Sequence, residues 1–178
     1  IFVHRQENIK LAGSGDQIHV AQGTYKPTNT TDRTISFQLK TGVEIDGGYA
    51  GSTSATPDAR DVAAFPTILS GDIGAIGKTG DNSYHVVVGS GTDTTAVLDG
   101  MTVTGAKANG SGLNQGNGGG LLIVAGSPTL KNCTFSANSS MYDGGGTAVS
   151  AAAATCANCT FSGNCADLGG GLSICNCA

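Results

Sequence analysis

Short runs that alternate apolar and polar residues recur along the chain. Cys133-Thr134-Phe135-Ser136 places Cys and Phe on one side of an extended strand and Thr and Ser on the other, and residues 159–162 repeat the same four residues 26 positions later. Residues 101–104, MTVT, have the same form. Strict alternation over four residues predicts a half-buried β-strand at each place.

Glycine triplets share this period. They begin at Gly118, Gly144 and Gly169, which are 26 and 25 positions apart. A period in this range is typical of solenoids, and a unit of this length fits one coil of a parallel β-helix with Gly or Asn at its bends. A leucine-rich repeat has a similar period, but its spaced Leu and Asn positions are absent. We therefore predict one all-β domain over residues 1–178, a right-handed parallel β-helix of about six to seven coils, with the clearest repeats in 127–178.

Stacked coils lie about 4.8 Å apart, so equivalent residues should form ladders along the solenoid. The residues that we expect to face inward are Ile18, Val20, Val43, Ile45, Ile68, Val86, Val88, Leu98, Met101, Val103, Leu121, Ile123, Leu130, Cys133, Phe135, Cys159, Phe161, Leu172 and Ile174. Asn132 with Asn158, inside strands, and Asn138 with Asn164 are expected to form amide ladders.

Residues 1–12 are expected to be an N-terminal cap or a donated strand, with a short helix within 6–12. No capping segment is visible after the strand expected at 172–174. Because an open solenoid end exposes unpaired backbone groups, we expect head-to-tail self-association into filaments. A fragment of a longer β-helix is the alternative. Insertions off the coils are expected at 51–64, at 71–82, which is rich in Gly and Asp, and at 106–120, which is rich in Asn and Gly.

Composition narrows the class of protein. The chain has 29 Gly in 178 residues, no Trp and 12% charged residues, which is typical of a tightly turning all-β protein. A net charge of −4 argues against nucleic acid as a partner. No apolar run reaches 18 residues, so no membrane span is expected, and Ile1 begins what looks like a mature or trimmed chain. All six Cys lie in 133–177, and with the low charge they favour an extracellular or cell-surface location.

Several segments carry a family resemblance: GDQIHVAQGTY (15–25), FQLKTGVEIDGGYAG (37–51), TILSGDIG (67–74), DNSYHVVVGSGTDTTAVLDGMTVTG (81–105) and SPTLKNCTFSAN (127–138). They resemble secreted bacterial right-handed parallel β-helix proteins of the pectate-lyase-like fold, and are similar to the repeats of polymorphic outer-membrane proteins. The resemblance covers nearly the whole chain and implies a large surface or secreted protein. The N-terminal cap looks shortened, and the last 25 residues carry five Cys where the family usually has small polar residues.

Catalytic residues are not evident in the sequence. A lyase of this fold needs an acidic cluster with an Arg or Lys base, and a hydrolase needs paired acids. Most of the 13 acids follow turn patterns, including Asp46 and Asp99, and Asp58, Arg60 and Asp61 are expected to form a solvated charge cluster. No cofactor is expected apart from a possible calcium ion, whose weak candidate ligands are Asp72, Asp81 and Asp93.

The cysteines allow several arrangements. Disulfide candidates are Cys133, Cys156, Cys159, Cys165, Cys175 and Cys177, with Cys133–Cys159 in register one coil apart and the other pairings open. The pairs Cys156-x-x-Cys159 and Cys175-x-Cys177 also have a spacing that a zinc site can use.

Two histidines and three asparagines are expected at the surface. His19 and His85 are expected at outward positions. Sequons mark Asn29, Asn109 and Asn138 as glycosylation candidates.

The function predicted from the sequence is an extracellular structural or adhesive module. One alternative is a carbohydrate-binding or polysaccharide-cleaving enzyme of the same fold. Another is an ice-binding solenoid, because Thr102, Thr134 and Thr160 are expected to form an outward row.

Overall fold

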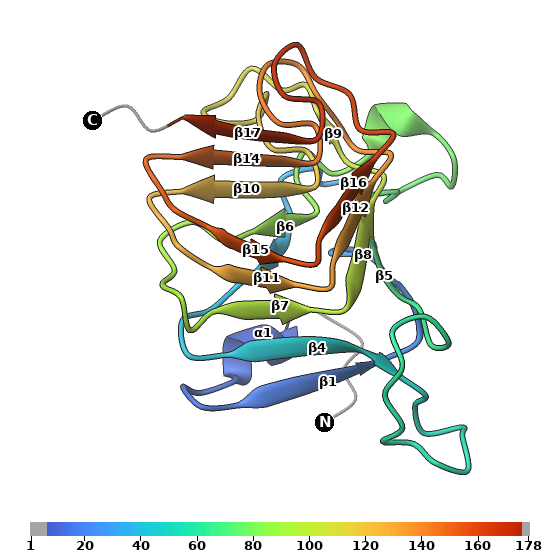
Figure 1. Ribbon diagram of the computed structural model, residues 1–178. Coiled ribbons are helices and arrows are strands. Elements are labelled where there is room, and N and C mark those ends of the chain that lie inside the picture. Colours follow the sequence, from blue (N-terminus) through green and yellow to red (C-terminus); the bar gives the residue numbers. More distant parts are fainter. Residues whose placement is uncertain (1–6, 176–178) are drawn as a thin grey trace.

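Three parallel β-sheets form the walls of a right-handed β-helix. The computed structural model describes residues 7–175 (Figure 1). The first sheet contains β1 (Gln17–Ala21), β4 (Glu44–Tyr49), β7 (Val97–Asp99), β11 (Thr129–Lys131) and β15 (Thr155–Ala157). The second contains β2 (Gly23–Tyr25), β5 (Thr67–Ser70), β8 (Met101–Thr104), β12 (Thr134–Ser136) and β16 (Thr160–Ser162). The third contains β3 (Phe37–Gln38), β6 (Val87–Val88), β10 (Leu121–Val124), β14 (Thr147–Ser150) and β17 (Leu172–Cys175).

One strand from each sheet makes a coil, and each coil pairs in parallel with the next. The predicted fold class is therefore confirmed. The described residues make five coils, where chain length suggested six or seven. Long connections explain the difference, since residues 50–66, 71–86 and 105–120 leave the coils. The last of them carries β9 (Lys107–Ala108), which pairs with β13 (Ser139–Ser140).

Inward side chains stack in ladders from coil to coil. Ile18, Ile45, Leu98, Leu130 and Cys156 are in register along the first sheet. In the second sheet Phe135 is fully buried and stacks on Phe161, with ring centroids 5.2 Å apart. These contacts make the interior a continuous apolar column, as the alternation predicted.

The inward phase predicted for two strands was wrong. Ile68 and Val88 are only half-buried, whereas their neighbours Leu69 and Val87 point into the core. Long connections precede both strands, so the sequence period does not fix their phase. In β5, the phase is set by the pairing of Leu69 with Val103 in the adjacent coil.

The last coil leaves its inward side chains partly exposed. Leu172 is 37% and Ile174 59% exposed, although they align with buried residues of β14. Within the described residues, β15, β16 and β17 have a neighbouring strand on one side only, so no further layer covers these side chains.

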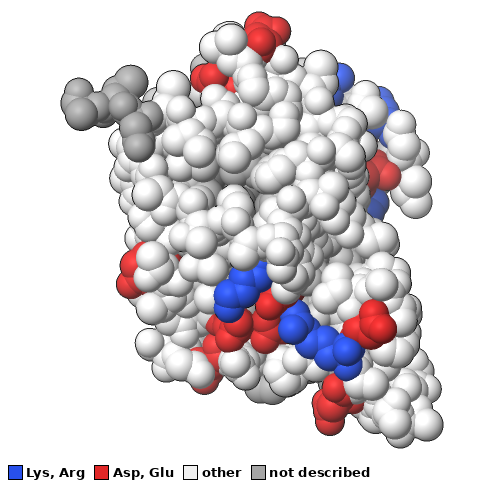
Figure 2. Space-filling view, in the orientation of Figure 1, with Lys and Arg blue, Asp and Glu red and all other residues white. Residues whose placement is uncertain are grey.

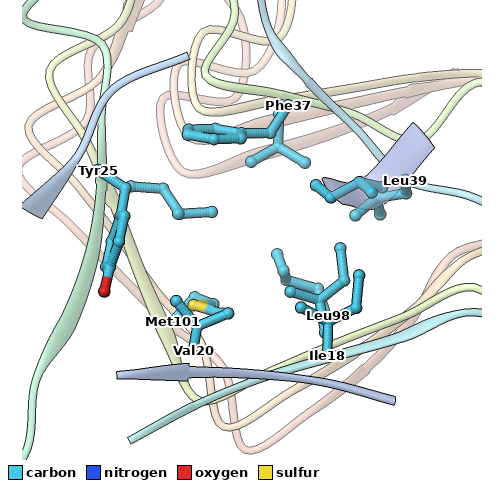
Figure 3. Close-up of a pocket in the computed structure, with 11 residues that line it drawn as sticks. Ile18, Val20, Tyr25, Phe37, Leu39, Leu98 and Met101 are labelled. Atoms are coloured by element: carbon cyan, nitrogen blue, oxygen red, sulfur yellow. The ribbon is translucent and has the colours of Figure 1, made fainter. Parts of the chain in front are cut away.

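At the other end, α1 (Glu7–Leu11) lies over the first coil and confirms the short helix expected within 6–12. Ile9 and Ala12 are buried there. A small gap of about 30 Å³ lies beneath Ile9, between Tyr25, Phe37 and Leu39 on one side and β1, Leu98 and Met101 on the other (Figure 3). Its apolar lining makes it a packing defect of the core. The strand expected at residues 1–3 lies outside the described residues.

Asparagines hold the bends in two different ways. Asn138 is 1% exposed, and its Nδ2 donates to Val103 O while Asn164 Oδ1 accepts from its backbone N–H at 3.0 Å. This confirms an inward amide ladder. Asn132 and Asn158 also form their predicted ladder, since Asn158 Nδ2 donates to Asn132 Oδ1 at 3.3 Å. They were expected inside strands, but they are exposed turn residues with φ of 50° and 55°, a left-handed conformation that asparagine tolerates.

Candidate functional site

Charged side chains converge on the outward face of the first sheet. Asp46, Asp99 and Lys131 are in register on β4, β7 and β11, so they form one row across three coils. Glu44 lies two residues before Asp46 and therefore on the same face. Arg60 reaches this face from the connection 50–66. We call these five residues the charged cluster. Figure 2 shows charged groups gathered over this part of the solenoid, below a largely uncharged middle of the same face.

The three acids of the charged cluster meet closely. Glu44, Asp46 and Asp99 each offer an oxygen within 4.8 Å of the others, and Asp46 and Asp99 are only 6% and 7% exposed. Arg60 Nη2 lies 2.9 Å from Asp99 Oδ1 and 4.0 Å from Asp46 Oδ1. Lys131 Nζ lies 3.6 Å from Glu44 Oε1. Three carboxylates and two cations leave the charged cluster with a formal charge of −1.

Arg60 fastens the connection 50–66 back onto the sheet. Its Nε donates to Gly47 O at 2.9 Å, and its backbone forms an antiparallel bridge with Tyr49. The Tyr49 ring stacks on His19, with centroids 4.3 Å apart. The prediction of a solvated Asp58/Arg60/Asp61 group was therefore wrong for Arg60, because the folded connection turns its guanidinium onto the buried carboxylates.

Asp46 and Asp99 have different surroundings. Asp99 Oδ1 accepts hydrogen bonds from Arg60 and from Asn132 Nδ2, the latter at 2.9 Å. Asp46 Oδ1 is buried and has no hydrogen-bond partner. Burial, and then repulsion by Glu44, raises the pKa of Asp46 to about 6. Asp46 is thus a group that can hold a proton near neutral pH or offer a free oxygen to a cation.

The acids predicted as calcium ligands are used elsewhere. Both Asp72 oxygens accept from Gly77 N–H and Asp81 Oδ2 accepts from Ala75 N–H, so these two close the connection 71–86 on itself. Asp93 Oδ1 accepts from Thr95 N–H in the turn before β7. Within residues 7–175, the three-acid group whose oxygens meet is Glu44, Asp46 and Asp99.

The sequence held a signal for two of these acids. Ile45-Asp46-Gly47 and Leu98-Asp99-Gly100 are the same apolar-Asp-Gly pattern, and Ile45 and Leu98 belong to one ladder. Aligning the coils on this pattern would have stacked the two acids. The arrival of Arg60 has no such signal.

The other predicted residues are dispersed. His85 was expected at the surface but is 8% exposed, with Nδ1 2.9 Å from Gly118 O, and burial lowers its pKa. Asn29 and Asn109 are exposed, whereas burial of Asn138 contradicts its choice as a glycosylation acceptor.

The cysteines and the threonine row were the remaining predicted features. The described cysteines, Cys133, Cys156, Cys159, Cys165 and Cys175, are free thiols without a disulfide, and Cys177 lies outside the described residues. The outward row of Thr102, Thr134 and Thr160 is in register as predicted, and it continues through Ile68 to Thr24.

A shallow depression of about 300 Å³ adjoins the charged cluster at Glu44. Asp16 and Thr95 line it, and Gln17 Nε2 donates to Glu44 Oε2 at 2.9 Å at its edge.

Comparison of the chain with protein-family models, with curated proteins and with solved structures found no match. Among the described residues, no helix is long and apolar enough to cross a membrane.

Proposed function

We propose that the protein is an extracellular adhesive β-solenoid, of the kind that its sequence resembles, and that it binds carbohydrate on the outward face of the first sheet through a calcium ion. The observation that carries this proposal is the buried Oδ1 of Asp46, which lies between Glu44 and Asp99 and has no hydrogen-bond partner, with Arg60 no nearer than 4.0 Å. A free carboxylate oxygen in a site of net negative charge is what a hard divalent cation requires.

Calcium suits the ligand types present. It takes six to eight oxygen ligands, and carboxylates with water or carbohydrate hydroxyls supply them. The depression beside Glu44 leaves room for a sugar ring next to the ion. Arg60 and Lys131 oppose a cation, so we expect weak binding, on the order of 0.1–1 mM, as in other extracellular calcium modules.

Calcium titration with thermal unfolding tests the ion. The melting temperature of the native chain should rise as calcium is added, and Asp46→Asn and Asp99→Asn should abolish the rise. Asp72→Asn and Asp93→Asn are matched controls that should retain it. A rise that persists in Asp46→Asn and disappears in Asp72→Asn would move the site to the connection 71–86. No rise at 10 mM calcium would exclude the proposed ion.

Retention on immobilised polysaccharides tests the carbohydrate. We expect the chain to be retained with calcium and released by a chelator, and Glu44→Gln to reduce retention. Equal retention with calcium and with chelator would show that carbohydrate binding does not require the ion.

Polysaccharide cleavage is a second candidate, favoured by the contrast between Asp46 and Asp99. A carboxyl with a pKa near 6 beside one that accepts hydrogen bonds from Arg60 resembles an acid–nucleophile pair. Their oxygens lie within 4.8 Å, nearer to the carboxyl separation of retaining glycosidases, about 5 Å, than to that of inverting ones. Release of reducing sugar that disappears in Asp46→Asn would support cleavage. Binding without release would leave the adhesive function alone.

Two sequence predictions stay predictions. Head-to-tail self-association is tested by sedimentation of the purified chain over a concentration series. Ice binding through the threonine row is tested by thermal hysteresis, and Ile68, which interrupts that row between Thr24 and Thr102, is a reason to expect none.

A further inference from the structure

Three cysteines come together in the last two described coils of the solenoid, at inward ladder positions. Cys156 and Cys159 come from the last coil and Cys133 from the coil before it. Cys133 and Cys159 lie in register in adjacent coils, and Cys156 precedes Cys159 by three residues in the last coil. We call these three residues the thiol cluster.

The thiol cluster stands where other coils have aliphatic residues. Cys156 continues the ladder of Ile18, Ile45, Leu98 and Leu130. Cys133 and Cys159 each precede a threonine, and those two threonines pair in register, so both cysteines follow Met101 in a second ladder. A cysteine side chain buries less apolar surface than Leu or Met at such a position. We therefore look for a role in the reactivity of the thiols.

Register places Cys133 and Cys159 at a disulfide-compatible separation. Adjacent parallel strands lie about 4.8 Å apart, and disulfides join Cα atoms about 4.4–6.8 Å apart. The backbone hydrogen bond from Thr160 N–H to Cys133 O, 2.9 Å long, holds the two coils at this spacing. A bond between these sulfurs therefore needs only side-chain rotation.

Accessibility assigns different roles to the two thiols. Cys133 is 1% exposed, and its Sγ lies 3.1 Å from Lys131 O, so a reagent in solution does not reach it. Cys159 is half-buried in the last described coil. Interaction with Cys133, and then with Cys156, lowers the pKa of Cys159, which favours its thiolate over those of its neighbours.

We propose that Cys159 is a thiol–disulfide exchange site for small disulfides such as oxidised glutathione, and that Cys133 is its resolving thiol in the neighbouring coil. The Cys159 thiolate attacks one sulfur of the small disulfide, forms a mixed disulfide and releases a thiolate. The Cys133 sulfur then attacks the Cys159 sulfur of the mixed disulfide, and the second thiolate, expelled at that position, takes up the Cys133 proton. Two electrons pass from the protein thiols to the small disulfide, and a Cys133–Cys159 bond joins the last two coils.

The distribution of cleavage sites makes the product easy to identify. No Lys or Arg follows Lys131, and Asp143 and Asp167 are the acids of this region. Trypsin with an Asp-specific protease therefore yields fragments 132–142, 143–166 and 167–178, which separate Cys133 from Cys156, Cys159 and Cys165. After oxidised glutathione and thiol blocking, we expect fragment 132–142 covalently joined to 143–166.

Matched variants test the assignment. Cys159→Ser should abolish the link, and Cys165→Ser, which removes an exposed thiol outside the thiol cluster, should keep it. In the reduced protein, Cys159 should alkylate about tenfold faster than Cys165. Far-UV circular dichroism should show that both variants keep the fold. A wild-type chain without the link, a disulfide confined to fragment 143–166, or a link that persists in Cys159→Ser would each overturn the proposal.

Discussion

The second and third coils and the last two coils use the same scaffold in opposite ways. In the former, the column is aliphatic and the distinctive groups stand outside, where Asp46 and Asp99 meet Arg60. In the latter, the outward strand positions other than Lys131 and Cys175 are Thr, Ser and Ala, and the distinctive groups are the thiols of Cys133, Cys156 and Cys159 at inward ladder positions.

Regularity separates the two regions as well. The last two coils follow a 26-residue step without long connections, from Thr129 to Thr155 and from Thr134 to Thr160. The second coil sends out residues 50–66, and that connection supplies Arg60. A solenoid can thus gain an outward site by inserting chain between strands, whereas an uninterrupted coil changes its chemistry through the inward residues that its ladders stack.

Truncation of the stacked phenylalanines should give the largest effect and sharpen the contrast within one ladder. Phe135→Ala should lower the free energy of unfolding by about 3–5 kcal/mol, because the side chain is fully buried. Phe161→Ala should cost less, because Phe161 is only half-buried in the last coil. Denaturant unfolding measures both. Thr134→Ala is the outward control, and a cost equal to that of Phe135→Ala would contradict the inward assignment.

Removal of Arg60 should break the outward site. Arg60→Ala removes the charged hydrogen bond to Asp99 and the bond to Gly47 O, so we expect a loss of about 1.5–3 kcal/mol. The connection 50–66 should also become more susceptible to proteolysis. Arg60→Lys keeps the charge but not the forked geometry, and should recover part of the loss. Unchanged stability in Arg60→Ala would mean that the guanidinium is only a surface charge.

The raised pKa of Asp46 predicts that the folded protein is more stable at mildly acidic pH than at neutral pH. Its folded-state pKa of about 6 exceeds its usual value of 3.8, so the folded protein binds more protons than the unfolded chain between these values. Stability should therefore fall as pH rises from about 4 to about 6, by on the order of 1–2 kcal/mol from this group. Unfolding curves at several pH values measure the slope, and Asp46→Asn should flatten it. Asp58→Asn, an exposed acid, is the control.

A glycine in the fourth coil should give the smallest effect and a gain. Ala137 has φ of 52°, while the equivalent positions of the third and fifth coils are Gly105 and Gly163. A left-handed conformation costs an alanine about 1–2 kcal/mol, and the greater freedom of glycine in the unfolded chain offsets part of it. Ala137→Gly should therefore stabilise the protein by about 0.5–1 kcal/mol, visible as a higher midpoint in denaturant. A destabilised variant would mean that the alanine methyl group contributes packing that its exposure does not indicate.

The sequence by itself determined the class of fold and the geometry of the last two coils. Alternation at 133–136 and 159–162, with the glycine triplets, was sufficient to predict parallel strands stacked in register, because side-chain period and strand spacing are local properties of extended chain. The amide ladder of Asn138 with Asn164 and the ladder of Phe135 with Phe161 followed from the same repeat.

Only the tertiary structure decided the phase of β5 and β6, the burial of His85 and the charged cluster. Each depends on how a long connection returns to the coils, and that path is set by contacts between residues far apart in sequence. Asp46 and Asp99 read as turn residues because each is followed by glycine. They become neighbours because one coil stacks on the next, and Arg60 joins them because its connection folds back over β4. The period of a repeat specifies what stacks, but the long-range contacts of the insertions specify which charges meet.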